Sequence, residues 1–206
     1  MNKKEVEAIE SALNTTKELM EIVLDSAIQQ PELVEKIPVV NLVKAGYDIT
    51  QAIKDNSRRK KFRLFLDGFN VVRLGEENVM KFKQRYYEDP DFKEDFDEFV
   101  LEQIESHERG IKNKVLGCLV ASYVNENINY QTLQSLSYCL SRLHPEGIQH
   151  LHNLSKHDFY IQGGANELPD EETFLIGAGI GYRNGTKFTV TAKGMLLYNT
   201  GIAPLF

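Results

Sequence analysis

The chain has 206 residues, a formal net charge of −6 and two cysteines, Cys118 and Cys139. With 42% hydrophobic and 26% charged residues, a mainly disordered chain is excluded, and two cysteines in apolar stretches predict buried free thiols rather than a disulfide framework. An acidic chain repels phosphate at long range, so nucleic acid is not the expected partner. No apolar run reaches the ~20 residues of a membrane-spanning helix and no signal-peptide core is visible, which favours a cytoplasmic protein.

Residues 3–29 are predicted to form one amphipathic helix that Pro31 ends. Its apolar residues recur at spacings of three and four, which is a heptad-like pattern. They are Val6, Ile9, Leu13, Thr16, Met20, Val23 and Ala27. One interpretation is a coiled-coil surface for a protein partner or for a second copy of the chain. The other is an ordinary amphipathic helix packed on its own core.

The segment 37–69 combines an apolar helix with a basic cluster and aromatics. Pro38 fits the first turn of a helix that is apolar on most sides through Ile53. The bases that follow are Lys54, Arg58, Arg59, Lys60, Lys61 and Arg63. Such a segment can insert into an anionic bilayer, which would make the protein peripheral to the inner membrane, and the cluster could also grip phosphate. The simpler interpretation is a core helix next to a solvated basic face.

The stretch from Glu88 to Glu108 holds ten acidic residues and one lysine. Its apolar residues, Phe92, Phe96, Phe99, Val100 and Ile104, recur at helical spacing, so we expect an acidic amphipathic helix with Asp91 or a neighbour as its N-cap. Glu98, Glu102 and Glu105 share one face, which we expect to be solvated. The basic and acidic segments suggest charge pairing, either within the fold or between protomers of a homo-oligomer.

Further helices are predicted over residues 76–87, 111–124, 130–143 and 148–154, and a short one over 171–176. Asn184-Gly185 between two extended runs predicts a type I′ hairpin over 182–191, after which Thr191 caps a final short helix through Tyr198. The expected fold is mainly α: a helical bundle of six to eight helices, residues 1–157, with a small C-terminal α+β segment, residues 158–206.

No motif reaches the level of a catalytic, cofactor or metal site. His150 and His152 are two residues apart and face different sides of a helix, so His144, His150, His152 and His157 do not predict a metal site. Cys139 and His144 lack an orienting third group. The glycines of residues 177–181 lead into a hairpin and not into a helix, which disfavours a nucleotide loop. We therefore expect a protein that is not an enzyme and carries no cofactor.

The C-terminal order of short helix, hairpin and Thr191-x-x-Gly194 resembles the wing and following helix of winged-helix domains. The similar residues are Phe188, Thr189, Val190, Thr191 and Gly194, within about 30 residues. The resemblance implies a winged-helix-like segment, and one interpretation is a DNA-binding regulator. However, residues 158–206 hold five acids and three bases, and Glu171 and Glu172 lie on the expected recognition helix, so the charge favours protein contact instead.

The rest of the chain resembles small uncharacterised bacterial helical proteins found in phage and mobile-element contexts. The resemblance lies in the general order of the Ile37-Pro38-Val39-Val40 helix, the basic stretch, the acidic helix and the leucine-rich helices. It implies a role in phage–host conflict. The leading hypothesis is a non-enzymatic interaction or regulatory protein; the alternatives are a membrane-active effector that inserts residues 37–69 and a winged-helix DNA binder.

Overall fold

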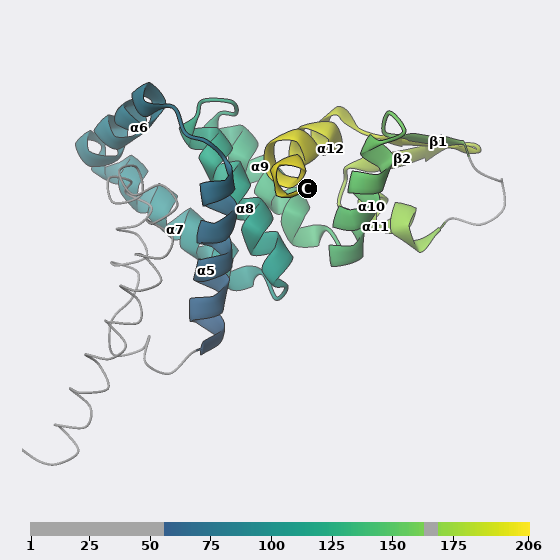
Figure 1. The fold of residues 1–206 in the computed structure, drawn as a ribbon, viewed down its shortest axis with the longest axis horizontal. Helices are drawn as coiled ribbons and strands as arrows, with labels where there is room; N and C mark the ends of the chain where they lie inside the picture. Colours follow the sequence, from purple (N-terminus) through teal and green to yellow (C-terminus); the bar gives the residue numbers. More distant parts are fainter. Residues whose placement is uncertain (1–55, 163–168) are drawn as a thin grey trace, which may run out of the picture.

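The computed structural model describes residues 56–162 and 169–206, and this part of the chain is mainly helical (Figure 1). The helical body comprises α5 (Asn56–Val71), α6 (Glu76–Glu88), α7 (Pro90–Ser106), α8 (Gly110–Val124), α9 (Tyr130–Arg142) and α10 (Pro145–Ser155). A small α+β part follows, with β1 (Tyr160–Gln162), α11 (Asp170–Gly177), β2 (Gly181–Asn184) and β3 (Lys187–Val190). The chain ends in α12 (Ala192–Leu197), the π-helix η1 (Tyr198–Ile202) and the 3-10 helix η2 (Ala203–Leu205). The expected fold class is confirmed.

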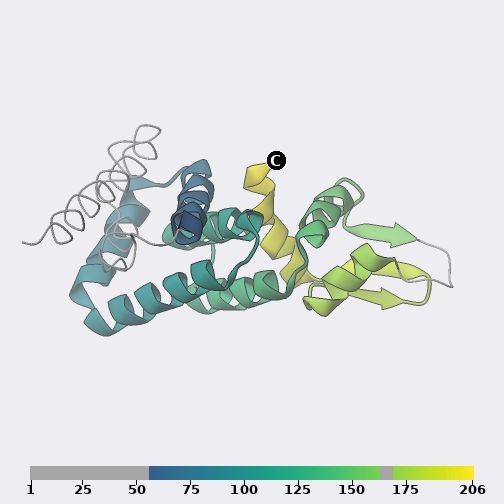
Figure 2. The same cartoon turned by 90° about the horizontal axis from the view of Figure 1, so that it is seen from below.

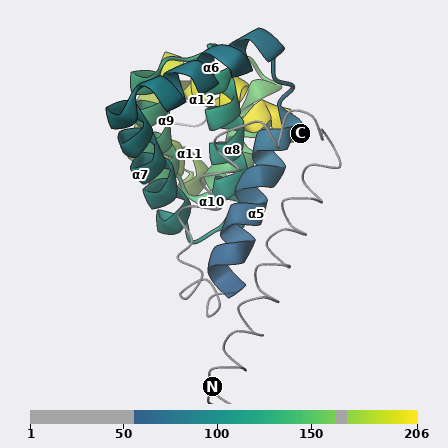
Figure 3. The same ribbon diagram turned by 90° about the vertical axis from the view of Figure 1, so that its left-hand side faces the viewer.

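Helix α8 lies at the centre of the helical body. It is apolar on nearly every side, and all of its residues from Val115 to Val124 are buried. A helix of this kind must be surrounded by other elements. Helices α5 and α9 and the C-terminal η1 pack against it, and Figure 3 shows α5 running along one flank of the body while α6 crosses one end of it.

Two glycines allow α5 and α8 to cross closely. A methyl group at Gly68 would overlap the Lys114 carbonyl oxygen, and one at Gly117 would overlap the Phe65 carbonyl oxygen. The Cys118 thiol is buried in the same contact and donates to the Gly68 carbonyl oxygen at 3.2 Å. Burial raises the pKa of Cys118 to about 12. Since Cys139 is also buried, the prediction of two buried free thiols is confirmed.

The acidic helix forms as expected, as α7. Its N-cap is the neighbouring Asp89 and not Asp91, which lies inside the first turn of the helix. The Asp89 carboxylate accepts from the Phe92 N–H at 3.0 Å, and Pro90 also occupies the first turn. Its apolar stripe is buried, namely Phe92, Phe96, Val100 and Ile104, whereas Glu98, Glu102 and Glu105 are exposed, as predicted. In α10 the helix begins at Pro145, so the helix predicted over 148–154 is one turn longer at its N-terminus.

The three strands form an antiparallel sheet in the order β1-β3-β2. The hairpin between β2 and β3 is present, but its turn differs from the prediction. Asn184 pairs with Lys187, so the two central residues are Gly185 and Thr186, and Gly185 alone has a positive φ, of +60°. A type I′ turn on Asn184-Gly185 would need a positive φ at Asn184 as well. Glycine at the first central position instead fits a type II′ turn.

The C-terminal elements return to the helical body after the sheet (Figure 2). Thr191 caps α12 as predicted, since its hydroxyl oxygen accepts from the Gly194 N–H at 3.1 Å. In the following π-helix, the Thr200 carbonyl oxygen accepts from the Ser122 hydroxyl of α8 at 3.0 Å. Residues on both sides of position 157 therefore share one packed region, and the domain boundary expected there stays a prediction.

Candidate functional site

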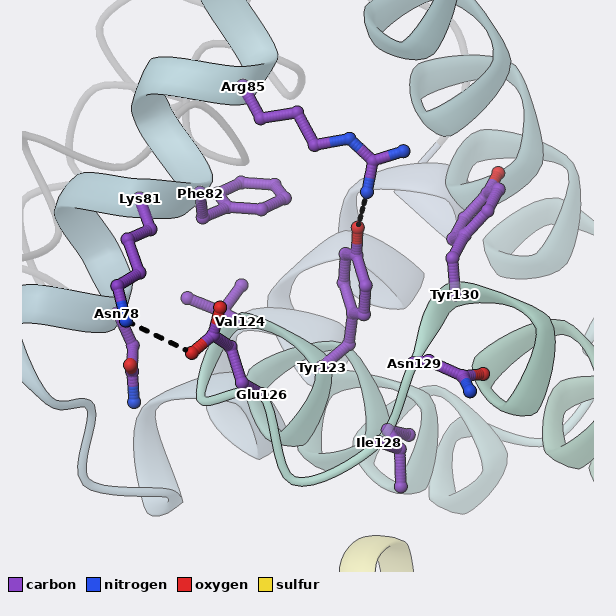
Figure 4. Close-up of a pocket in the computed structure, with 10 residues that line it drawn as sticks. All are labelled: Asn78, Lys81, Phe82, Arg85, Tyr123, Val124, Glu126, Ile128, Asn129 and Tyr130. Carbon is purple, nitrogen blue, oxygen red and sulfur yellow. Dashed lines mark hydrogen bonds and ion pairs between the residues drawn. The ribbon is translucent and has the colours of Figure 1, made fainter.

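A pocket of about 290 Å³ opens at the surface between α6 and the turn that joins α8 to α9 (Figure 4). Its volume is close to the lower end of the range of ligand pockets. Two segments that lie roughly 40 residues apart in the chain supply its lining. These are Asn78, Lys81, Phe82 and Arg85 of α6, and Tyr123, Val124, Glu126, Ile128, Asn129 and Tyr130 around the α8–α9 turn.

The interior of the pocket is aromatic. The rings of Phe82 and Tyr123 meet edge to face at 5.9 Å between centroids, and those of Tyr123 and Tyr130 lie 5.7 Å apart. Such contacts stabilise the rings beyond their burial by about 0.5–1.5 kcal/mol per pair. Burial raises the pKa of both tyrosines, so both phenols are protonated at neutral pH. The walls are therefore apolar surfaces with fixed positions.

Arg85 is held across the pocket by two contacts. Its guanidinium lies 3.8 Å from the centroid of the Phe92 ring, and its Nη1 donates to the Tyr123 hydroxyl at 3.3 Å. Figure 4 shows the guanidinium pointing toward Tyr123 from α6. The cation–π contact and the hydrogen bond fix the orientation of a charge that would otherwise be mobile. An anionic group of a ligand would meet a preorganised partner here.

The rim opposite Arg85 is an ion pair between α6 and the turn. Lys81 Nζ lies 3.4 Å from Glu126 Oε2 and 2.9 Å from Glu77 Oε1. The hydrogen bond to Glu77 is the main reason that the pKa of Lys81 is raised. Glu126 itself has a φ of +59°, a conformation that costs energy for any residue except glycine.

The strained residue belongs to a Schellman motif that ends α8. The N–H of Asn127 donates to the Ser122 carbonyl oxygen at 3.0 Å, and that of Glu126 donates to the Tyr123 carbonyl oxygen at 2.9 Å. Glycine or asparagine usually occupies the left-handed position of this motif. The chain places glutamate there instead, and its carboxylate meets Lys81 at the rim of the pocket.

The framework of the pocket is tied together by amide side chains. Asn125 accepts from the Gly75 N–H at 2.9 Å and donates to the Arg73 carbonyl oxygen at 2.9 Å, which joins the turn to the start of α6. Asn78 donates to the Asn125 carbonyl oxygen at 3.1 Å, and Asn129 caps α9 by accepting from the Thr132 N–H at 2.8 Å. The pocket is therefore built on a hydrogen-bonded frame and is formed before any ligand arrives.

The lining side chains of the pocket are aromatic, aliphatic, amide or charged. They include no serine, cysteine or histidine that could pair as nucleophile and base, and the two phenols have raised pKa values. The arrangement offers an apolar interior, an oriented arginine and a charged rim. An apolar group that carries a nearby acid would be complementary to this combination.

The interaction residues predicted from the sequence lie elsewhere. Val6, Ile9, Leu13 and Met20 lie outside the described residues, and Arg58 and Arg59 fall in α5 at positions where only the backbone is described. Lys60 and Arg63 are exposed, and Lys61 Nζ donates to the Glu105 carbonyl oxygen at 2.6 Å. The basic segment thus contacts the acidic helix within one chain at that point, and Lys60, Lys61 and Arg63 do not line the pocket.

The late histidines point to different neighbours. His144 stacks on Phe174 at 4.3 Å, and His152 stacks on Phe206 at 4.0 Å. His150 is half-buried, and burial lowers its pKa. Within residues 56–162 and 169–206, no cluster of three or more histidine, cysteine or acidic side chains is placed to hold a metal ion.

The expected recognition helix, α11, has a buried acid in place of an exposed one. Glu172 is 2% exposed and pairs with Arg183 of β2, whereas Glu171 is exposed. The aromatic half of the segment 37–69 is also internal, because Phe62, Phe65 and Phe69 lie in the core. In the part of the chain that the structure covers, no helix has the length and apolar character needed to span a bilayer.

The described part of the chain is therefore a mainly helical fold with a surface pocket that has aromatic walls and an oriented arginine. Comparisons of the chain with protein-family models, with curated proteins and with solved structures gave no match.

Proposed function

We propose that the chain is a non-enzymatic interaction protein of regulatory type, and that the pocket between α6 and the α8–α9 turn receives a side chain of a protein partner. The observation that carries this proposal is the fixed guanidinium of Arg85 beside an aromatic interior. Buried aromatic side chains and arginines supply most of the energy at protein interfaces, and they do so where their positions are set in advance.

The chemistry of the pocket specifies the partner's anchor. An aliphatic or aromatic side chain would lie against Phe82, Tyr123 and Tyr130, and its burial would contribute about 1.5–3 kcal/mol. A carboxylate next to it on the partner would pair with Arg85. Charge-assisted bonds to arginine are roughly twice as strong as neutral ones, so an acidic neighbour would set both affinity and orientation.

The test compares Arg85→Ala with Arg73→Ala. Both residues are exposed arginines near α6, but only Arg85 lines the pocket. Proteins recovered with the tagged chain from its own cells are quantified for each variant by mass spectrometry. We expect at least one protein that the wild type and Arg73→Ala recover equally and that Arg85→Ala recovers at least about thirtyfold less, because a hot-spot arginine contributes about 2 kcal/mol or more.

The partner can also be a second copy of the chain, and the solution mass distinguishes this case. Light scattering would then give a multiple of the 23.6 kDa monomer for the wild type and a smaller mass for Arg85→Ala. A wild-type chain that is monomeric and recovers the same proteins as Arg85→Ala would contradict the proposal. A role in phage–host conflict, implied by the resemblance above, would make the partner a phage or host regulatory protein.

The alternative function is membrane insertion of residues 37–69, with peripheral association of the protein with an anionic inner-membrane surface. This alternative requires a change in the packing of α5. Phe65 and Leu66 are 0% and 1% exposed in the contact between α5 and α8, so insertion would require α5 to leave the core. Co-sedimentation with anionic liposomes, compared with a chain in which Arg58, Arg59, Lys60 and Lys61 are replaced by serine, tests this alternative separately.

A further inference from the structure

A second and larger cavity, of about 800 Å³, lies on another part of the molecule, where helix ends from the body meet α11. It is bordered by the end of α7 and the start of α8, by the end of α9 and the start of α10, and by α11 on the far wall. Figure 1 shows α11 next to α10 of the helical body. We call this cavity the basic groove, after the charges that line it.

The lining of the basic groove is positive in a chain whose net charge is negative. Arg109, Lys112 and Arg142 line it against a single acid, Glu108. A local excess of cations in a concave, partly desolvated surface concentrates anions there. Arg109 and Arg142 are exposed, so their guanidinium groups are within reach of a ligand that enters the groove.

Lys112 supplies a fixed charge at the base of the groove. Its ammonium donates to the Ser141 carbonyl oxygen near the C-terminus of α9 at 2.7 Å, which orients the side chain. Burial lowers the pKa of Lys112, and Glu108 partly offsets this effect. An anion in the groove would act in the same direction as Glu108 and would compensate the desolvation of the ammonium.

Two helices begin at the groove and add to its positive potential. Arg109 is the N-cap residue of α8 and His144 is the N-cap residue of α10. The N-terminus of a helix carries about half a positive elementary charge and favours nearby anions. These two ends support the side-chain cations of the groove, which are the main attraction.

A planar surface lies beside the cations. The ring of His144 stacks on that of Phe174 from α11, with the centroids 4.3 Å apart and the planes 27° apart. The His144 side chain is 49% exposed, so part of its ring is accessible from the groove. A planar group of a ligand can extend this stack while its charged portion contacts the arginines.

We propose that the basic groove binds a small polyphosphate-bearing ligand with a planar ring, of the nucleotide class. The phosphate oxygens contact Arg109 and Arg142, with Lys112 behind them, and the ring stacks on His144. Arginine pairs with phosphate through two parallel hydrogen bonds, which suits a polyanion that has one arginine on each side. The glycines of residues 177–181 take no part as a phosphate loop, because they end α11 and lead into β2. The proposal is independent of the protein-interaction function at the other pocket.

The test is isothermal titration calorimetry of the full chain with ATP, with GTP and with inorganic tripolyphosphate, each against sodium sulfate at matched ionic strength. We expect saturable binding of all three phosphate ligands and none of sulfate, with the nucleotides tighter than tripolyphosphate. Arg109→Ala and Arg142→Ala should each weaken binding by about tenfold, since one hydrogen bond to a charged group contributes about that factor.

Three variants separate the groove from general charge effects. Arg73→Ala and Arg85→Ala remove exposed arginines outside the groove and should leave the nucleotide affinity unchanged. His144→Asn retains a residue suited to cap α10 and removes the ring, so it should reduce nucleotide affinity to that of tripolyphosphate. Equal losses in the four arginine variants, inside and outside the groove, would overturn the proposal. An absence of phosphate binding, or equal binding of sulfate, would overturn it as well. Equal affinity for nucleotide and tripolyphosphate in the wild type would overturn the role of His144.

Discussion

Glu172 of α11 and Arg183 of β2 form a buried ion pair, in which Arg183 Nε lies 2.9 Å from Glu172 Oε2. The side chain of Arg183 is 15% exposed and that of Glu172 is 3% exposed. The pair joins the short helix to the sheet and removes from the surface one of the two acids that were expected there. A buried carboxylate that keeps its charge needs such a partner, because desolvation alone would be costly. The pair therefore fixes α11 against the sheet.

Replacing Glu172 by glutamine should lower the free energy of unfolding by about 1.5–3 kcal/mol, because the hydrogen bonds from Arg183 lose their charged acceptor. Glu171→Gln changes the neighbouring exposed residue in the same way and should change stability by less than about 0.5 kcal/mol. Urea unfolding followed by circular dichroism measures both. Equal losses in the two variants would show that the pair does not hold α11.

The close crossing of α5 and α8 predicts a sharp difference between two glycines. Gly117→Ala should destabilise the fold by about 1–3 kcal/mol or more, because the new methyl overlaps the Phe65 carbonyl oxygen in a contact between two backbones. At Gly177 a Cβ meets nothing within 4 Å, so Gly177→Ala should be neutral or slightly stabilising. Thermal unfolding of the two variants checks this, and a Gly117→Ala chain as stable as the wild type would contradict the packing.

His107 predicts a loss of stability in mild acid. It is 2% exposed, and its Nδ1 contacts Asn113 Oδ1 at 3.1 Å. Burial is the main cause that lowers its pKa from 6.5 to about 4, and the nearby charges of Lys112 and Lys61 act in the same direction. The unfolded chain therefore binds a proton between about pH 6.5 and 4 that the folded chain does not, so stability falls as the pH drops through this window.

The size of this effect is about 3 kcal/mol once the pH is below 4, from about 1.4 kcal/mol for each unit of pKa difference. His107→Gln should flatten the dependence by that amount, whereas the same change at the exposed His157 should leave it in place. Urea unfolding at pH 7, 5.5 and 4 gives the comparison. Parallel curves for wild type and His107→Gln would contradict the buried, neutral state of this histidine.

The backbone conformation of Glu126 predicts a difference in stability between glycine and alanine at this position. Its φ of +59° suits glycine, so Glu126→Gly should be more stable than Glu126→Ala by about 1 kcal/mol, although both variants lose the same exposed contact with Lys81. Calorimetric unfolding of the two variants measures the difference. If the Glu126→Gly and Glu126→Ala chains unfold at the same temperature, the left-handed conformation carries no cost at this position.

Helical periodicity predicted much of the body. Phe92, Phe96 and Val100 recur at helical spacing and are buried in α7 as that spacing requires, and the caps at Asp89 and Thr191 follow from local chemistry. In contrast, β1 was not predicted. It spans three residues and is defined by pairing with β3, nearly 30 residues away, which a local pattern does not contain.

The pocket could not be predicted from the sequence either, because a local pattern does not contain contacts between distant segments. Arg85 and Tyr123 meet only because α6 packs beside the end of α8, and each looks like an ordinary helix residue in the sequence. The local indications are modest, because the sequence shows only that Lys81 and Arg85 are one helical turn apart. The hairpin lies where the sequence predicts it, but the two central residues of its turn are one position later than predicted. The register of the two strands, and not the Asn-Gly pair, determines which residues form the turn.

The most direct test of the proposed function places a photo-cross-linking amino acid at Lys81, on the rim of the pocket, and separately at Met80, which is 69% exposed on the same helix but does not line the pocket. Irradiation of cells that produce each variant is followed by electrophoresis and mass spectrometry. We expect a cross-linked species of one defined mass from position 81 that is absent from position 80 and is lost when Arg85→Ala is added. Identical products from the two positions, or no product from position 81, would contradict the claim that this pocket anchors a protein partner.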